Sequence, residues 1–567
     1  MGSRTNADYA DYRAWVHLNY SDFAGGLVEA SRSAERAGSA MSPSPRRLIV
    51  VSNRLPYVVS RDAHNRWKVV PGSGGLVSAL VPILRQRGGT WIGWPGMAAE
   101  QGLDQVLADV GAGCGYALKP VHLTSDEVQN FYQGFSNAVV WPLFHDLQSL
   151  CDFDPEYWRT YGAVNRKFAA AILENSDKSD FVWVHDYHLM NVAAELRAAG
   201  SRARLGFFLH IPFPSLDLFA KLPWCSQLID ALLQFDVIGF QTLRDRRNFM
   251  QCVRAVVPDV EFEGKGPVLT VNVAGRKVRV GAFPISIDFG AIERQAALPE
   301  VARKANELHR LLPGRKLLLG IDRLDYTKGI PHRLEAFADL LHRFPELRER
   351  ISLIQVVVPS RVEIRDYKDL KNTIERLVGR INGEFMRPGG WVPVWYVYGS
   401  LTATDLLAYY RAADIALVTP LRDGMNLVAK EYCASSIEED AVLILSQFAG
   451  AAAQLRRGAL LVNPYDIEGV AEAIRTAFAM SEEERRARMR RLRRGIRRHD
   501  VFWWVDSFLE AALATDGAGA AHEQRELPIL EEDYARHGLV NGEVEPETVT
   551  AFAENVSGRR PVANLLN

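Results

Sequence analysis

Residues 415–431 read IALVTPLRDGMNLVAKE. The stretch opens with apolar residues over the length of a strand, passes through a polar turn at Gly424, and ends in the pattern of a helix. A strand that is apolar on both faces and runs into a helix indicates a parallel sheet covered on both sides. In such sheets, ligands bind just beyond the carboxyl ends of the strands. The polar residues around Asp423 are therefore candidates for a binding site.

The same alternation recurs along most of the chain. Apolar runs of strand length end in polar residues at 48–52, 181–184, 205–209, 237–240, 316–321, 351–358, 415–418 and 441–445. Helix patterns lie between them, for example at 331–344 and 404–412. Two such series, separated near residues 283–285, predict an α/β fold with two Rossmann-like parallel-sheet domains that face a central cleft.

We expect five segments. The first is rich in Ala, Ser and Gly, and the last begins with Gly517-Ala518-Gly519 and continues acidic and polar. The expected segments are a disordered leader at 1–46, an N-terminal domain at 47–284, a C-terminal domain at 285–484, helices at 485–514 that pack back toward the N-terminal domain, and a largely disordered or loosely docked tail at 515–567.

Composition limits the class of protein. The chain has 567 residues, enough for two cores, and its 67 Lys and Arg nearly balance 68 Asp and Glu, which argues against nucleic-acid or membrane partners. The basic stretch 485–498 fits a solvated helix, because Glu482 and Glu484 precede Arg486 and Arg488 at i,i+4 spacing. The five cysteines form no CxxC pair, which favours reduced buried thiols in the cytoplasm. No apolar run approaches the roughly 20 residues of a membrane helix.

A glycine-rich segment, PGSGGLV at 71–77, precedes a helix pattern. The backbone amides of Gly74 and Gly75 could approach a phosphate closely, because glycine has no Cβ. A plain turn explains the segment equally well. Its spacing is not GxGxxG, which disfavours a nicotinamide enzyme.

Charged residues follow several of the expected strands. Arg323 and Lys328 lie in one strand-to-helix loop, where paired positive charge could stabilise a leaving diphosphate; the alternative is a surface ion pair. Asp423 could accept hydrogen bonds from sugar hydroxyls and Glu431 from a ribose; alternatively, Asp423 caps the helix and Glu431 lies on its surface. His210 stands at a strand end, in a segment that Pro212 and Pro214 make rigid, and is either a ligand contact or a structural buried histidine.

Taken together, these segments resemble the trehalose-6-phosphate synthase family, glycosyltransferase family 20, from about residue 48 to about residue 508. The matching stretches are 51–56, 184–189, 207–214, 322–329, 359–361, 379–383 and 418–432. The resemblance implies a GT-B fold, in which the N-terminal domain binds the acceptor and the C-terminal domain binds a nucleotide sugar. Two departures are Ser286, where the family usually has glycine, and Pro95, where serine is common.

The resemblance also implies the roles of particular residues. It assigns the acceptor, glucose 6-phosphate, to Arg54, Tyr132, Trp141, Asp186 and Arg361. It assigns the donor, a nucleotide-glucose, to Gly74, Gly75, His210, Arg323, Lys328, Leu401, Asp423, Gly424, Met425, Asn426, Leu427, Val428 and Glu431. Among these, the candidates for catalysis are Asp186, His210, Arg323, Lys328 and Asp423. Because a cationic pair can replace a divalent metal, we expect no cofactor and no obligatory metal site.

The implied reaction is transfer of glucose from UDP-glucose, or another nucleotide-glucose, to glucose 6-phosphate with retention, giving α,α-trehalose 6-phosphate. A glucosylglycerol-phosphate synthase, a silent sugar-phosphate sensor and a sugar-nucleotide epimerase are the rival interpretations. The retained acceptor and donor groups argue against all three. We expect a separate phosphatase to act on the product. The nucleobase, the oligomeric state (a homo-oligomer included) and any regulation stay open at this point.

Overall fold

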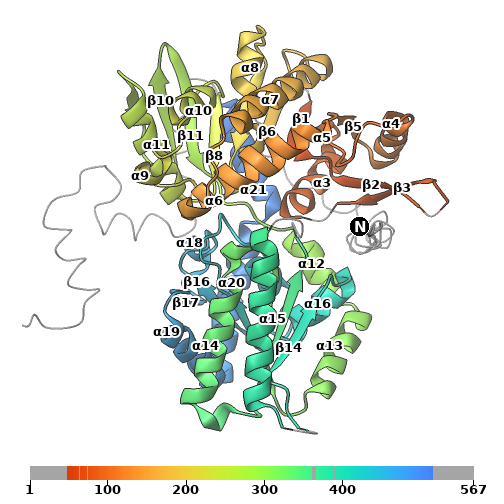
Figure 1. Cartoon of the computed structure of the whole chain (residues 1–567), viewed down its shortest axis with the longest axis vertical. Coiled ribbons are helices and arrows are strands. Elements are labelled where there is room, and N and C mark those ends of the chain that lie inside the picture. Colours follow the sequence, from red (N-terminus) through yellow and green to blue (C-terminus); the bar gives the residue numbers. More distant parts are fainter. Residues whose placement is uncertain (1–46, 63, 73, 361–364, 388–389, 515–567) are drawn as a thin grey trace, which may run out of the picture.

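The computed structural model describes residues 47–514 except 63, 73, 361–364 and 388–389. The expectations for segments 1–46 and 515–567 and for Arg361 lie outside the described residues. Figure 1 shows the described chain as two lobes, one above the other, each built on its own sheet.

The upper lobe contains a nine-stranded sheet. Its strands follow the order β5 (Ala117–Pro120), β4 (Thr90–Trp94), β1 (Leu48–Arg54), β6 (Phe181–His185), β7 (Arg204–Phe208), β8 (Val237–Phe240), β11 (Arg276–Ala282), β10 (Val268–Val273) and β9 (Glu261–Glu263). Neighbours from β5 to β11 pair in parallel, whereas β10 pairs antiparallel with β11 and β9. A separate hairpin joins β2 (Tyr57–Arg61) to β3 (Trp67–Pro71).

The lower lobe contains a six-stranded sheet in which every pairing is parallel. The strand order is β14 (Val394–Tyr398), β13 (Ile351–Val358), β12 (Lys316–Arg323), β15 (Ile415–Val418), β16 (Val442–Ser446) and β17 (Leu460–Val462). In the upper lobe, β1 is followed outward by β4 and β5 on one side and by β6, β7 and β8 on the other. In the lower lobe, β12 is followed outward by β13 and β14 on one side and by β15, β16 and β17 on the other. This is the doubly wound Rossmann order, so the predicted fold class is confirmed.

Helices connect and cover the strands (Figure 1). Those before the lower sheet are α3 (Gly75–Arg87), α4 (Leu103–Cys114), α5 (Ser125–Glu127), the π-helix η2 (Val128–Val140), α6 (Trp141–Phe144), η3 (Gln148–Leu150), α7 (Pro155–Asn175), η4 (Tyr187–Leu189), α8 (Val192–Ala198), α9 (Leu216–Phe219), α10 (Cys225–Leu232), α11 (Leu243–Val256), α12 (Phe289–Ala296) and α13 (Pro299–Leu311). The later ones are η5 (Tyr326–Lys328), α14 (Ile330–Arg343), η6 (Pro345–Leu347), α15 (Arg365–Phe385), α16 (Ala403–Ala412), α17 (Leu427–Ser435), α18 (Ala452–Leu455), α19 (Ile467–Ala479), α20 (Glu482–Arg498) and α21 (Val501–Leu513).

The last helix, α21, returns to the upper lobe. The Phe508 ring stacks on Trp183 of β6 at 4.4 Å between centroids, and Trp504 packs against the same indole at 5.1 Å. Gly206 and Gly239 leave room for Phe508, because a Cβ at either position would come within 3.0 Å of its ring. The chain therefore crosses between the lobes twice, once after β11 and once before α21.

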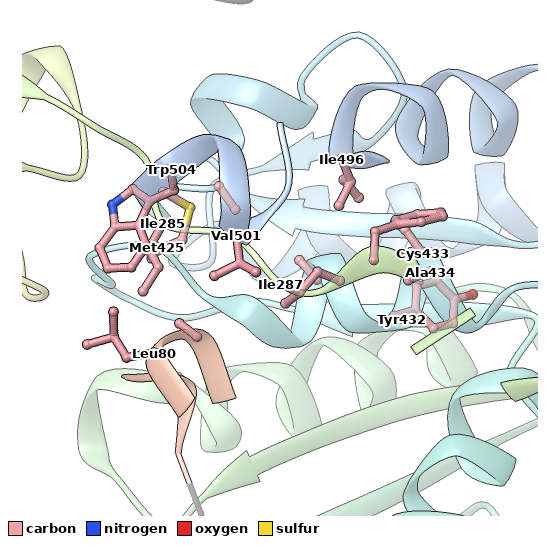
Figure 2. Packing of buried hydrophobic residues seen from close by; sticks show 14 of the residues in the cluster. Leu80, Ile285, Ile287, Met425, Tyr432, Cys433, Ala434, Ile496, Val501 and Trp504 are labelled. Atoms are coloured by element: carbon pink, nitrogen blue, oxygen red, sulfur yellow. The ribbon is translucent and has the colours of Figure 1, made fainter. Parts of the chain in front are cut away.

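One hydrophobic core continues across both crossings. It joins Leu80 of α3 to Ile285 and Ile287 of the first crossing, and these to α17, α20 and α21. Figure 2 shows Met425, Trp504 and Ile285 close together in this core. The remaining core residues form one cluster in each lobe.

The prediction of a solvated helix at 485–498 is wrong for one face of α20. The ion pairs Arg486–Glu482 and Arg488–Glu484 are present. Further along the helix, however, Arg493 is buried and donates to the carbonyl oxygens of Cys433 and Ala434 at the end of α17. The last carbonyl oxygens of a helix have no hydrogen-bond partner within that helix, so the Arg493 guanidinium can stabilise them by donating to them.

The cysteines are free, as predicted, but only two are buried. Cys252 and Cys433 are buried, whereas Cys114, Cys151 and Cys225 are half-buried. None of the helices in the described part of the chain is both long enough and apolar enough to span a membrane.

Candidate functional site

The chemistry-bearing residues gather at the two topological switch points. In the upper lobe the strand order reverses between β1 and β6, which end at Arg54 and just before Asp186. In the lower lobe it reverses between β12, which ends at Arg323, and β15, which leads to Asp423. A crevice opens at such points because the connections leave in opposite directions. Each lobe therefore presents one cation and one carboxylate at the place where its ligand is expected.

Asp186 is held firmly by backbone contacts. Its φ is +75°, its N–H donates to the carbonyl oxygen of Phe208, and its Oδ1 accepts from the backbone N–H of His210 at 3.2 Å. Burial raises the pKa of the Asp186 carboxyl to about 7, against the opposing effects of backbone N–H donors and of the Arg323 charge. The lower lobe's Arg323 thus acts electrostatically on the upper lobe's Asp186, and the two face one cleft.

His210 is paired with a second histidine. His185, the last residue of β6, is fully buried, and its Nδ1 lies 3.1 Å from His210 Nε2. Burial lowers the pKa of His210 to about 3 and that of His185 well below its usual value. Both rings are therefore neutral at physiological pH. His210 is partly exposed, so a ligand could contact it, and it also bonds to a buried residue. The structure is therefore compatible with both interpretations of His210, as a ligand contact and as a structural histidine.

Lys328 and Asp423 form an ion pair across two loops of the lower lobe. The Lys328 ammonium lies 2.6 Å from Asp423 Oδ2, and the Asn426 amide donates to the same oxygen at 3.1 Å. Burial alone would raise the pKa of Asp423, but Lys328 holds it below the usual range. The cap of α17 is Asn426, whose Oδ1 accepts from Ala429 N–H, so the interpretation of Asp423 as the helix cap is wrong.

Gly424 is required by the close approach of the lobes. A Cβ at this position would lie 2.0 Å from the carbonyl oxygen of His210. Similarly, a Cβ on Gly75 would lie 2.6 Å from the Leu427 side chain, while Gly74, with φ of +147°, precedes the first turn of α3. The N-termini of α3 and α17 therefore meet at the cleft, where the first N–H groups of a helix, which have no partner within the helix, can bind an anion.

Arg54 lies on an aromatic surface. Its guanidinium carbon is 4.1 Å from the centroid of Trp94 and 5.8 Å from that of Tyr132. A Cβ on Gly96, where φ is +89°, would overlap the guanidinium, so only glycine leaves room for this position of the side chain. Cation–π contacts and steric confinement together fix the direction of the Arg54 charge.

The other acceptor candidates lie on one helical segment. Tyr132 belongs to η2 and stacks on His188 at 5.8 Å, and Trp141, which is buried, begins α6 and packs on His145 at 4.2 Å. Tyr132 thereby lies beside Arg54, and Trp141 packs on Tyr187, the residue after Asp186, with ring centroids 5.8 Å apart. Pro95 lies beside Trp94 and Gly96, next to the Arg54 site.

The remaining donor candidates flank the start of α17. Leu427 and Val428 are half-buried in its first turn, and Leu401 follows the carboxyl end of β14. Glu431 is not a surface residue: its Oε2 accepts from Tyr410 at 3.0 Å, and burial raises its pKa. Met425 is buried in the shared core, and its carbonyl oxygen accepts from Ala451 N–H.

A family model supports the assignment that this geometry suggests. The model of glycosyltransferase family 20 matches residues 46–514. The chain belongs to glycosyltransferase family 20. A trehalose-6-phosphate synthase from Mycobacterium avium is 45% identical over 479 residues, covering 83% of this chain and 95% of the relative. One from Mycolicibacterium gilvum is 43% identical over 500 residues, covering 86% of this chain and 99% of that relative.

Solved structures of this family have the same two-lobed GT-B fold. An α,α-trehalose-phosphate synthase (UDP-forming) from Burkholderia xenovorans, in complex with glucose 6-phosphate, superposes with a TM-score of 0.74 at 36% identity, covering 82% of this chain and all of that one. An Escherichia coli structure bound with UDP-2-fluoro glucose also gives a TM-score of 0.74 at 36% identity, covering 83% of this chain and 99% of that one.

Three residues of this family-20 chain had no assigned role in the sequence analysis. They are His185, His145 and Lys430. His145 lies close enough to Lys328 and Asp423 for their charges to affect its pKa, which burial lowers to about 4. In the sequence, His185 could have been identified by its position between a buried strand and Asp186. Lys430 could have been identified as a lysine inside the apolar pattern of α17.

Proposed function

We propose that this family-20 enzyme transfers glucose from UDP-glucose to glucose 6-phosphate, giving α,α-trehalose 6-phosphate and UDP with retention of configuration. The observation that carries the proposal is the meeting of five charged groups at the two switch points: Arg54 and Asp186 above the cleft, and Arg323 with the Lys328–Asp423 pair below it. The substrates are those named for the Burkholderia xenovorans relative and, as the 2-fluoro analogue, for the Escherichia coli relative.

The two substrates meet in the cleft in this proposal. The sugar phosphate lies in the upper lobe, with Arg54 and Arg361 on its phosphate and Tyr132, Trp141 and Asp186 around the sugar. The nucleotide sugar lies between the N-termini of α3 and α17. Its diphosphate meets Arg323, Lys328 and the N–H groups near Gly75 and Leu427. Leu401 lies by the base, Glu431 by the ribose, and His210 and Asp423 by the transferred glucose.

The bond changes on one face of the donor sugar. The C1–O bond to the diphosphate breaks, and its electron pair leaves with the phosphate oxygen. The acceptor's anomeric hydroxyl oxygen bonds to the same C1 from the same face, and its proton passes to the departing phosphate. Arg323 and Lys328 stabilise the charge that develops on that phosphate, so the proposal requires no metal. A separate hydrolase would release free trehalose from the product.

Product analysis tests the proposal. Purified protein is incubated with UDP-glucose or GDP-glucose and with glucose 6-phosphate or glycerol 3-phosphate, in the presence of a chelator. We expect an α,α-1,1-linked disaccharide phosphate by mass spectrometry and NMR, from glucose 6-phosphate only. Transfer to glycerol 3-phosphate would identify the glucosylglycerol-phosphate alternative, and ligand binding without transfer would identify a sensor.

A variant tests the leaving-group role separately. Arg323→Ala should lower turnover by about 100-fold or more, because one preorganised donor to a developing anion contributes on that scale. Arg323 is exposed at the strand end, so its removal should leave the melting temperature nearly unchanged. Near-normal turnover of Arg323→Ala would remove Arg323 from the mechanism.

A further inference from the structure

His185 and His210 share a single hydrogen bond that has two opposite arrangements. Their nitrogens, Nδ1 of His185 and Nε2 of His210, are 3.1 Å apart. Because burial keeps both rings neutral, each ring carries one proton, and only one proton lies between them. Either His185 donates to His210, or His210 donates to His185.

The far side of His185 distinguishes these arrangements. Its Nε2 is buried and has no hydrogen-bond partner among the residues that the structure describes. The ring is surrounded by aromatic groups, with centroids of Trp183 at 4.7 Å and of Phe208 and Trp504 at 6.5 Å. If His210 donated, the proton of His185 would be on this Nε2 as a buried N–H without an acceptor. If His185 donates, Nε2 carries only a lone pair. Orphaned buried N–H groups are the rarer case in proteins, so the second arrangement is favoured.

We propose that His185 is a positioning residue that fixes His210 as the tautomer with its proton on Nδ1, so that His210 presents an N–H donor to a hydroxyl oxygen of the bound sugar. The ligand part of this inference rests on the proposed function. The geometry of the upper lobe supports it further, because Asp186 Oδ1 already holds the backbone of His210. Both the place of the ring and the position of its proton are thereby set before the substrate arrives.

The first test measures the proton directly in the ligand-free protein. The histidine rings are labelled with 15N, and the His210 resonances are assigned from their loss in His210→Ala. Ring 15N shifts separate a protonated nitrogen from a bare one. We expect His210 to carry its proton on Nδ1 and His185 on Nδ1. A proton on His210 Nε2 overturns the proposal, whatever the enzyme's activity.

The second test uses a matched pair of variants. His185→Asn keeps an N–H donor near the position of Nδ1, whereas His185→Leu removes it at similar size. We expect His185→Leu to weaken UDP-glucose binding and lower kcat/KM about tenfold, the effect of one hydrogen bond, and His185→Asn to keep most of both. Equal losses in the two variants overturn the proposal.

A double-variant cycle shows whether His185 acts through His210. In the His210→Ala background, His185→Leu should lower kcat/KM little further, because the group that it positions is absent. Independent, additive losses would contradict a positioning role. If no acceptor supports transfer but the ring NMR places the proton on His210 Nδ1, the proposed function fails and the tautomer assignment stands.

Discussion

Asp186 has a backbone conformation that glycine alone usually adopts. Its φ is +75° and its ψ 166°, and its carboxyl is buried enough for the pKa to reach about 7. Strain of this kind costs about 1–3 kcal/mol, and burial of the carboxylate adds to it. Asp186 lies at the switch point of the sheet, where a ligand is expected. The free-energy costs of its strain and burial are therefore explained by function and not by stability.

Asp186→Asn should therefore stabilise the protein and abolish transfer. Between the unfolded pKa near 3.9 and the folded value of about 7, the folded state holds a proton that the unfolded state has lost, so Asp186 lowers stability as pH rises. Asparagine keeps the acceptor for His210 N–H but has no charge. We expect an increase of about 1–3 kcal/mol in unfolding free energy at pH 8, shrinking toward pH 4, measured by denaturant titration. An unchanged stability at pH 8 would contradict the assigned burial of the charge.

At the Lys328–Asp423 pair, in contrast, removing one charge should destabilise the protein. Lys328→Met leaves the Asp423 carboxylate without its cation, which should raise the pKa of Asp423 and cost about 1–3 kcal/mol. Adding Asp423→Asn should restore most of that stability but none of the transfer activity. Thermal unfolding and a coupled UDP-release assay follow the two properties. Additive losses of stability in the double variant would show that the pair is not coupled.

Sequence position predicts which charged residues reach the cleft, but it does not predict their partners. Asp186, Arg323 and Asp423 were found because each follows an apolar strand. The alternative of Asp423 as a helix cap failed because Asn426 stands one residue before the helix and Lys328, distant in sequence, takes the carboxylate. The pairing of His185 with His210 depends on the neighbouring positions of β6 and β7, which no local pattern contains.

Among the elements, the strands that were long apolar runs were predicted within one or two residues. Those missed include β4, where Thr and Gly interrupt the pattern, and β14, which is rich in aromatic residues. The antiparallel extension of β9, β10 and β11 was also missed, because its half-buried strands alternate instead of running apolar. The buried face of α20 escaped prediction because arginine on that face bonds to carbonyls of another helix.

Gly424 shows how one element fixes the spacing between the lobes. Gly424→Ala should push the loop before α17 away from His210, since the added Cβ meets a backbone oxygen that no side-chain rotation can move. We expect UDP-glucose affinity to fall at least tenfold by calorimetry. Gly379→Ala, within α15, is the control and should bind normally, because a Cβ there meets no atom of the described residues within 4 Å. Equal affinities in both variants would mean that the loop tolerates a wider gap.

At the scale of the whole molecule, the two crossings between the lobes lie together. Val501 N–H, at the start of α21, donates to the carbonyl oxygen of Ile287 in the first crossing. Lys430 of α17 reaches the same crossing, and its ammonium donates to the Ile285 carbonyl oxygen and to Gln454 Oε1, both at 2.7 Å. The departure at Ser286 lies between these two contacts, and its buried hydroxyl has no hydrogen-bond partner in the described part of the chain. A single lysine thus links α17 to the segment about which the lobes would move.

Lys430 should make the free energy of unfolding of the protein depend on pH. Burial lowers the pKa of Lys430 to about 7, whereas the unfolded value is near 10.4. Between these values the unfolded state holds a proton that the folded state has lost, so the unfolding free energy should rise with pH, by at most about 1.4 kcal/mol per pH unit from this group. Lys430→Met should remove that rise between pH 7 and about 9.5.

The comparison needs a second lysine, because other groups also titrate in this range. Lys277 is exposed on β11, so Lys277→Met should keep the wild-type slope. Denaturant titrations of the three proteins at several pH values measure the slopes. Burial lowers the pKa of His499 most, and the Lys430 charge lowers it further, so His499 should titrate at higher pH in Lys430→Met than in the wild type. Parallel slopes in all three proteins would show that Lys430 is charged in the folded state throughout, and that the link between α17 and the crossing is an ammonium with its full charge at every pH tested.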